Sequence, residues 1–239
     1  FSPVILVIAV ATVVTMLIYW AISALFFRQD AAETMAGAAS SSYYNSVNIG
    51  LPIATYVLGD ATFVVPALVL QMAVLSPIVI AGLDRGAKGV GKSVLAGLTA
   101  PVVVAAFAGF AVSAASWTVP EPVLAPLEIL GGASIPLILM SFGASLTGEK
   151  VLTSHRGPTL TATALKLVGM PAVAWVLARL MRLDGTEMYA ALILCALPTA
   201  QNVYNYAATY RSGEVICRDT VFLTTFLALP AMLLIAGVF

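Results

Sequence analysis

The chain has 239 residues, of which 61% are hydrophobic and only 9% are charged. A soluble domain of this length would need far more charge to cover its surface. The 11 basic residues balance the 11 acidic ones, which indicates neither a nucleic-acid-binding tract nor a charged soluble partner domain. The mean hydropathy of +1.02 instead predicts an all-α integral membrane protein.

Apolar segments follow one another along the chain, and each is long enough to cross about 30 Å of hydrocarbon as a helix. In chain order, the predicted spans cover residues 2–27, 31–58, 61–83, 93–115, 127–147, 158–181, 186–210 and 215–239. The first has no basic n-region and no small-residue cleavage site, so we interpret it as a membrane span and not as a signal peptide. The two cysteines, Cys195 and Cys217, show no metal-ligand spacing and are expected to be packing residues.

Basic residues predict the orientation of these spans, because cytoplasmic loops carry an excess of lysine and arginine. One set of alternate loops and loop edges holds Arg28, Arg85, Lys88, Lys92, Lys150, Arg156, Arg211 and Arg218. The opposite set holds only Arg179 and Arg182. We therefore expect the richer side to be cytoplasmic and both ends of this chain to be extracytoplasmic, in a multi-pass protein of the plasma membrane.

Two segments 154 positions apart, 48–56 and 202–210, share Asn, Ala, Thr and Tyr in register. The same offset matches Arg28, Asp30 and Glu33 to Arg182, Asp184 and Glu187. The first three spans thus correspond to the last three. Each span lies five spans before its copy, and an odd number gives the two copies opposite orientations in the membrane, which indicates an inverted repeat. The spans at 93–147 would then have counterparts before residue 1. We expect a 5+5 repeat of about ten helices, of which this chain holds eight, with about 60 further residues ahead of it.

Both repeated segments place polar and helix-breaking residues inside apolar spans. The candidate site residues are Asn45, Asn48, Gly50 and Pro52 in or just before the first segment, and Pro198, Gln201, Asn202 and Asn205 in or just before the second. The backbone groups freed at such breaks need partners in lipid, so the breaks should line a protein-filled or wet cavity. Half-helix N-termini favour anions and amide side chains add neutral donors, which suits a carboxylate. The alternative is a pair of proline kinks whose asparagines only cross-link helices.

Lys166 lies inside the span at 158–181, roughly 12 Å along its helix. A lysine at that depth is costly, and we expect it to be a counter-charge to an anionic substrate or a titrating group, unless its side chain reaches toward the interface. Gln71 could face either the site or a neighbouring helix, and His155 is expected to be a solvated loop residue. The sequence contains no recognisable catalytic grouping, metal-ligand set or cofactor motif, so neither an enzyme nor a cofactor is predicted.

These segments resemble the auxin efflux carrier family, which contains plant auxin carriers and bacterial permeases for small organic acids. The resemblance covers nearly the whole chain. Its motifs are Asn45 with Gly50-Leu-Pro52; Pro198-Thr-Ala-Gln-Asn202 with Ala207 and Tyr210; Pro136-Leu137 with Gly143-Ala-Ser-Leu146; and Lys166-Leu167 with Pro171. The short loop at 84–92 favours a prokaryotic permease over a plant carrier.

The resemblance implies an inverted-repeat fold in which a dimer-forming scaffold supports a mobile, elevator-type transport core with crossed broken helices. Residues 1–83 would form the first repeat of the core, residues 93–147 the scaffold, and residues 158–239 the second repeat of the core. By resemblance to the family's crossover motifs, the residues expected to bind substrate are Asn45, Gly50, Pro52, Pro198 and Asn202. The same role for Asn48, Gln201, Asn205 and Lys166 rests on the repeat and on their chemistry.

The predicted function is a secondary transporter that moves a small organic anion, a dicarboxylate or an auxin-like carboxylate, by alternating access. Its expected partners are the carboxylate, the lipid bilayer, a second copy of the chain, and a proton or sodium ion. One alternative is a sodium-coupled organic-anion symporter of the bile-acid type, since Asn, Gln, Thr and backbone oxygens could hold sodium. Another is a non-transporting membrane subunit or sensor whose polar residues serve packing.

Overall fold

The computed structural model describes residues 2–56, 64–84, 90–147 and 150–238. Helices account for nearly all of these ranges, in which the only strand-like pairing is one isolated bridge. Four helical segments are long and apolar enough to cross a membrane: Pro3–Phe26, Pro66–Leu83, Arg156–Leu180 and Glu214–Val238. The predicted all-α membrane protein is thereby confirmed.

The long spans differ in how regular they are. Helix α1 (Pro3–Phe26) and helix α13 (Glu214–Val238) are continuous. Two other spans are interrupted by a π-helical turn. The first span consists of α4 (Val64–Leu70), the π-helical turn η3 (Gln71–Leu75) and α5 (Ser76–Leu83). The second consists of α9 (Arg156–Ala164), the π-helical turn η4 (Leu165–Gly169) and α10 (Met170–Leu180). Such turns are frequent at functional sites. Here η3 begins at Gln71 and η4 contains Lys166.

Two predicted spans are broken, as the sequence suggested. The span at 31–58 is divided into α2 (Ala31–Ser40) and a second half made of η1 (Ser46–Gly50) and α3 (Leu51–Tyr56). The span at 186–210 is divided into α11 (Gly185–Ala196) and α12 (Gln201–Tyr210). The carboxylates of Asp30 and Asp184 cap the first halves by accepting from the amides of Glu33 and Glu187, at 2.8 and 2.7 Å.

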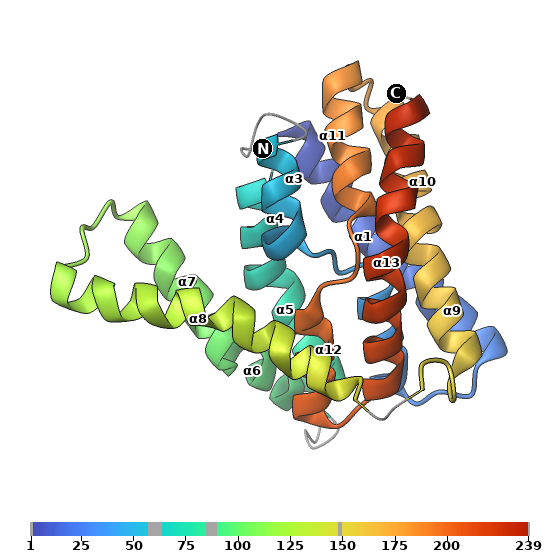
Figure 1. The fold of residues 1–239 in the computed structure, drawn as a ribbon, viewed down its shortest axis with the longest axis horizontal. Helices are drawn as coiled ribbons and strands as arrows, with labels where there is room; N and C mark the ends of the chain where they lie inside the picture. The colour runs from blue at the N-terminus through green and yellow to red at the C-terminus, as the bar shows by residue number, and fades with distance from the viewer. Residues whose placement is uncertain (1, 57–63, 85–89, 148–149, 239) are drawn as a thin grey trace.

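The middle of the chain stands apart from the other helices (Figure 1). Helix α6 (Val90–Thr99) is followed by a bend before Pro101, and α7 (Pro101–Ala114) and α8 (Glu121–Ser145) project to one side. Helix α8 begins six residues before the predicted span at 127, because Pro120 and Pro122 can start a helix and Glu121 suits its first turn. The division into core and scaffold agrees with this shape but stays a prediction.

The remaining helices form a bundle around the two broken spans. Buried side chains of α1, α10, α11 and α13 make one apolar cluster, and those of α2, α5 and α12 contribute to a second. Both described chain ends lie at the same end of this bundle (Figure 1), as expected if both termini are on one side of the membrane. Which side is cytoplasmic stays a prediction; Arg85 and Lys88, on which it partly rests, lie outside the described residues.

Candidate functional site

The two breaks cross each other at the centre of the bundle. Tyr44 and Thr199 form an antiparallel bridge, so the chain runs in opposite directions through the two breaks. The Asn45 amide donates to the Pro198 carbonyl at 2.9 Å, and the Ala200 amide donates to the Tyr43 carbonyl at 3.1 Å. We call residues 41–45 and 197–200 the crossover. Its antiparallel geometry agrees with the predicted inverted repeat, which otherwise stays a prediction.

Gly50 allows the crossed segments to approach closely. A Cβ atom at this position would lie 2.9 Å from Leu197 Cδ1 and 3.2 Å from the Asn45 carbonyl oxygen. The Gly50 amide donates to that carbonyl at 2.8 Å. The absence of a side chain at Gly50 thus makes room for Leu197 and the Asn45 carbonyl, and Gly50 does not line the cavity described below.

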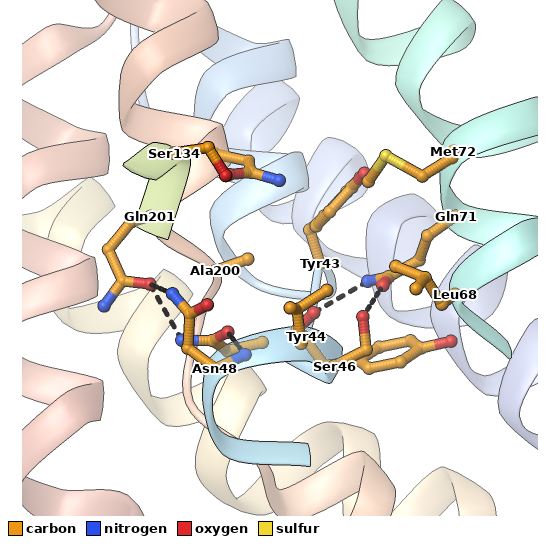
Figure 2. A pocket seen from close by; sticks show the side chains of 13 residues that line it. Tyr43, Tyr44, Ser46, Asn48, Leu68, Gln71, Met72, Ser134, Ala200 and Gln201 are labelled. Carbon is orange, nitrogen blue, oxygen red and sulfur yellow. Dashed lines mark hydrogen bonds between the residues drawn. The ribbon is translucent and has the colours of Figure 1, made fainter. Parts of the chain in front are cut away.

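Amide side chains connect the two broken spans at the crossover (Figure 2). Asn45 Nδ2 donates to Gln201 Oε1 at 2.8 Å, and Asn48 Nδ2 donates to the same oxygen at 3.4 Å. Asn45 Oδ1 accepts from the Asn48 backbone amide at 3.2 Å and so caps the start of η1. Three predicted site residues are thus brought together from segments more than 150 positions apart in the sequence.

Gln71 closes the opposite side of the site. Its side chain is fully buried; Nε2 donates to the Tyr44 carbonyl at 2.8 Å, and Oε1 accepts from the Ser46 hydroxyl at 2.5 Å. Figure 2 shows these two bonds on the far side of the crossover from Gln201. Of the two orientations left open by the sequence, Gln71 adopts the one that faces the site.

A cavity of about 140 Å³ lies between these groups. It is lined by Tyr43, Tyr44, Asn45, Ser46, Val47, Asn48, Leu68, Gln71, Met72, Ser134, Ala200, Gln201 and Asn202. These side chains are all neutral. The amides of Gln201 and Asn202, at the start of α12, have no backbone acceptor within the described residues, and the Asn202 side chain makes no hydrogen bond there. The cavity therefore presents hydrogen-bond donors and the positive end of a helix dipole.

The carbonyl oxygens around the crossover are mostly occupied by donors from the protein itself. Besides those of Tyr43, Tyr44, Asn45 and Pro198, the Ser40 carbonyl accepts from the Thr199 hydroxyl at 2.6 Å. The Thr199 amide in turn donates to Thr224 Oγ1 at 3.1 Å. Freed acceptors are thus satisfied by the protein, while donors remain at the cavity.

The structure separates the predicted site residues into two groups. Asn45, Asn48, Gln201 and Asn202 line the cavity, and Gly50, Pro52, Pro198, Asn205 and Lys166 do not. Pro52 is exposed near the start of α3, and Pro198 serves the crossover through its carbonyl. Asn205 faces a separate hollow between α12 and α8, beside Leu137 and Ser141.

Lys166 is fully buried behind the crossover. Its Nζ donates to the Cys195 carbonyl at 2.6 Å and to Met170 Sδ at 3.1 Å, and it lies 5.9 Å from the centre of the Tyr44 ring. It does not snorkel to an interface. Cys195 belongs to the last turn of α11, whose carbonyls lose their helical partners at the break.

Sequence reasoning missed several cavity residues. Tyr43, Tyr44 and Ser46 lie next to the predicted asparagines, and the position of the break alone could have suggested them. Met72 and Ser134 come from other spans, and only the fold brings them to the site. Ser134 lies on α8, in the predicted scaffold.

Comparisons with known proteins agree with this architecture. Residues 88–236 match the sequence profile of the family described as Membrane transport protein. An uncharacterized transporter of Methanocaldococcus jannaschii is 28% identical over 107 residues, which cover 45% of this chain and 34% of that protein. A Rhizobium meliloti protein named "Putative malonate transporter" is 25% identical over 233 residues, which cover 92% of this chain and 72% of that protein.

The first match therefore spans only about a third of its relative, whereas the second extends over most of both chains. The family profile covers more than half of the chain, including α12, α13 and the residues around Lys166. The resemblance drawn from the crossover motifs is thus confirmed: the chain belongs to the membrane transport protein family, that of the auxin efflux carriers.

Proposed function

We propose that this protein is a secondary transporter of a small dicarboxylate and that the cavity at the crossover is its substrate site. The observation that carries the proposal is the neutral, donor-lined cavity at the start of α12, in which the Gln201 and Asn202 amides lack backbone acceptors within the described residues. A helix N-terminus with free amides favours an anion, and the side-chain amides of Asn48 and Asn202 add donors without a fixed charge.

The size of the cavity supports a compact substrate. At about 140 Å³ it is smaller than the roughly 300–1,000 Å³ typical of sites for drug-sized ligands. An acid of three or four carbons suits this volume better than an indole-sized one. The name of the Rhizobium meliloti relative points to the same class, and malonate is therefore the first substrate to test.

A sodium-coupled mechanism receives less support. Sodium needs several convergent oxygen ligands, and the carbonyls of Ser40, Tyr43, Tyr44, Cys195 and Pro198 already accept hydrogen bonds. Uptake should therefore be unchanged when external sodium is replaced by choline. A strict sodium requirement would favour the bile-acid-type alternative.

Transport would proceed by alternating access, with α1–α5 and α9–α13 as the moving core and α6–α8 as the scaffold. Ser134 of α8 lines the cavity together with crossover residues, so the substrate would lie where core and scaffold meet. Movement of the core would then expose the cavity to one side of the membrane at a time.

The decisive experiment measures the uptake of radiolabelled malonate into proteoliposomes that contain variants of two asparagines on α12. Asn202→Ala removes a cavity donor whose side chain has no hydrogen-bond partner within the described residues, so uptake should fall with little effect on stability. Asn205→Ala is the matched control, because Asn205 lies on the same helix but outside the cavity. Its uptake should stay near wild type.

Equal uptake by wild type and Asn202→Ala would reject the crossover cavity as the site. No uptake of any acid in a panel of small carboxylates, combined with no thermal stabilisation of the purified protein by those acids, would favour the non-transporting subunit or sensor instead.

A further inference from the structure

Lys166 is a buried cation that contacts both broken spans. Its Nζ binds the carbonyl of Cys195 at the end of α11 and faces the ring of Tyr44 in the first break. Within the described residues it has no carboxylate partner; its contacts are a carbonyl, a thioether sulfur and an aromatic ring. A buried lysine paired only with neutral groups is unusual, because desolvation of the charge is then offset only in part.

The surroundings of Lys166 nevertheless favour a cation. The C-terminal end of α11 carries the negative end of its helix dipole, and an aromatic face within about 6 Å adds further attraction. In transporters with broken helices, such C-terminal ends commonly coordinate a coupling cation. Here the side chain of Lys166 supplies the positive charge from within the protein.

Tyr44 also takes part in the proposed substrate cavity. Tyr44 is a lining residue, whereas Lys166 is not. Lys166 therefore cannot bind the substrate directly in this arrangement, but only the crossover separates its charge from the cavity. Because Lys166 and Tyr44 are both buried, the charge is screened less than it would be in water and acts on an anion in the cavity.

We propose that Lys166 is a remote counter-charge that determines selectivity for dianions over monoanions at the crossover cavity. This inference rests on the proposed function and deepens it. Lys166 is a specificity-determining residue that acts without touching the substrate. Its hydrogen bond to Cys195 holds the ammonium in place, and its charge offsets one negative charge of the cargo.

The test uses two cargoes of nearly equal shape and different charge: malonate, and its monoamide malonamate. Lys166→Gln removes the charge but keeps an N–H donor for the Cys195 carbonyl, and Lys166→Arg keeps the charge. We expect Lys166→Gln to raise the KM for malonate about tenfold more than the KM for malonamate. Lys166→Arg should leave the ratio of the two KM values near that of wild type.

The outcomes separate charge from structure. If Lys166 serves only to cap α11, Lys166→Gln will change both KM values by the same factor or neither, and the proposal is overturned. Lys166→Met, which has neither charge nor donor, repeats the test should Lys166→Gln fail to reach the membrane. Absence of wild-type uptake for every carboxylate would reject the proposed function, whereas an unchanged ratio in an active transporter rejects only the role of Lys166.

Discussion

Single side chains at the crossover replace the hydrogen bonds that a regular helix would have made. Gln71 provides both a donor and an acceptor, one to the Tyr44 carbonyl and one to the Ser46 hydroxyl. An amide can do this because it carries both functions on one rigid group. Since Gln71 is fully buried, its amide nitrogen and amide oxygen depend on these two partners in place of water.

We therefore expect Gln71→Leu to destabilise the protein by about 1–3 kcal/mol, because the buried Ser46 hydroxyl loses its acceptor and the Tyr44 carbonyl keeps only the Ser46 backbone amide as a donor. Malonate uptake should fall as well, since Tyr44 and Ser46, which Gln71 holds in place, both line the cavity. Thermal unfolding in detergent and proteoliposome uptake measure the two effects. Leu68→Met is the control: it lines the same cavity, conserves volume, and should change stability little. Unaltered stability of Gln71→Leu would contradict this role.

Gly50 is constrained by packing at the crossing point. We expect Gly50→Ala to lower the melting temperature and the uptake rate, because the added methyl would lie 2.9 Å from Leu197 and 3.2 Å from a backbone oxygen. Gly143→Ala is the matched control on α8, where an added Cβ meets nothing within 4 Å. It should be neutral or stabilising by about 0.5–1 kcal/mol, because alanine favours helix more than glycine does.

At the scale of helices, each break is stabilised by a residue from another span. Gln71 of η3 supports the first break, and Thr224 of α13 supports the second by accepting from the Thr199 amide. The 154-residue offset of the repeat matches residue 71 to residue 225, so Gln71 and Thr224 differ by one position from being equivalent in the two copies. Each broken helix is thus stabilised in its interrupted conformation by a side chain from the span that follows it in the sequence.

This arrangement predicts that Thr224→Val destabilises the protein by about 1–3 kcal/mol, because the buried Thr199 amide loses its acceptor. Valine keeps the shape of threonine, so packing is nearly unchanged. Thr224→Ser keeps the hydroxyl and should remain close to wild type. Equal melting temperatures for the Val and Ser variants would show that the hydrogen bond contributes nothing measurable.

For the whole molecule, the predicted orientation can be tested with cysteine labelling. The native Cys195 and Cys217 are fully buried, so they should give little background with a membrane-impermeant maleimide. Thr118, between α7 and α8, and Ser154, before α9, are both exposed. Thr118→Cys should react in intact cells, and Ser154→Cys only after the membrane is opened. The reverse pattern would overturn the orientation.

The sequence determined the class of this protein and which two of its spans are broken. Composition predicted membrane helices, and the polar segments with Gly and Pro predicted that two spans are interrupted. The second break, at residues 197–200, contains Pro198; the first, at residues 41–45, precedes Gly50 and Pro52, which lie within η1 and α3. These features are local: hydropathy, and a missing backbone donor such as that of Pro198, act on the residues that carry them. The same segments also carry the motifs by which the sequence resembles its family, and the family profile confirms that membership.

Only the tertiary structure decided which predicted residues share the cavity. Asn202 and Asn205 have the same chemistry and lie within one turn of α12, but they face different surroundings: Asn202 lines the crossover cavity, and Asn205 lines the hollow beside Leu137 and Ser141 of α8. Lys166 and Gln71 are both buried polar residues in π-helical turns, and packing directs Gln71 to the cavity and Lys166 behind it. Such positions depend on how distant helices pack against each other, which the residues of one segment do not determine.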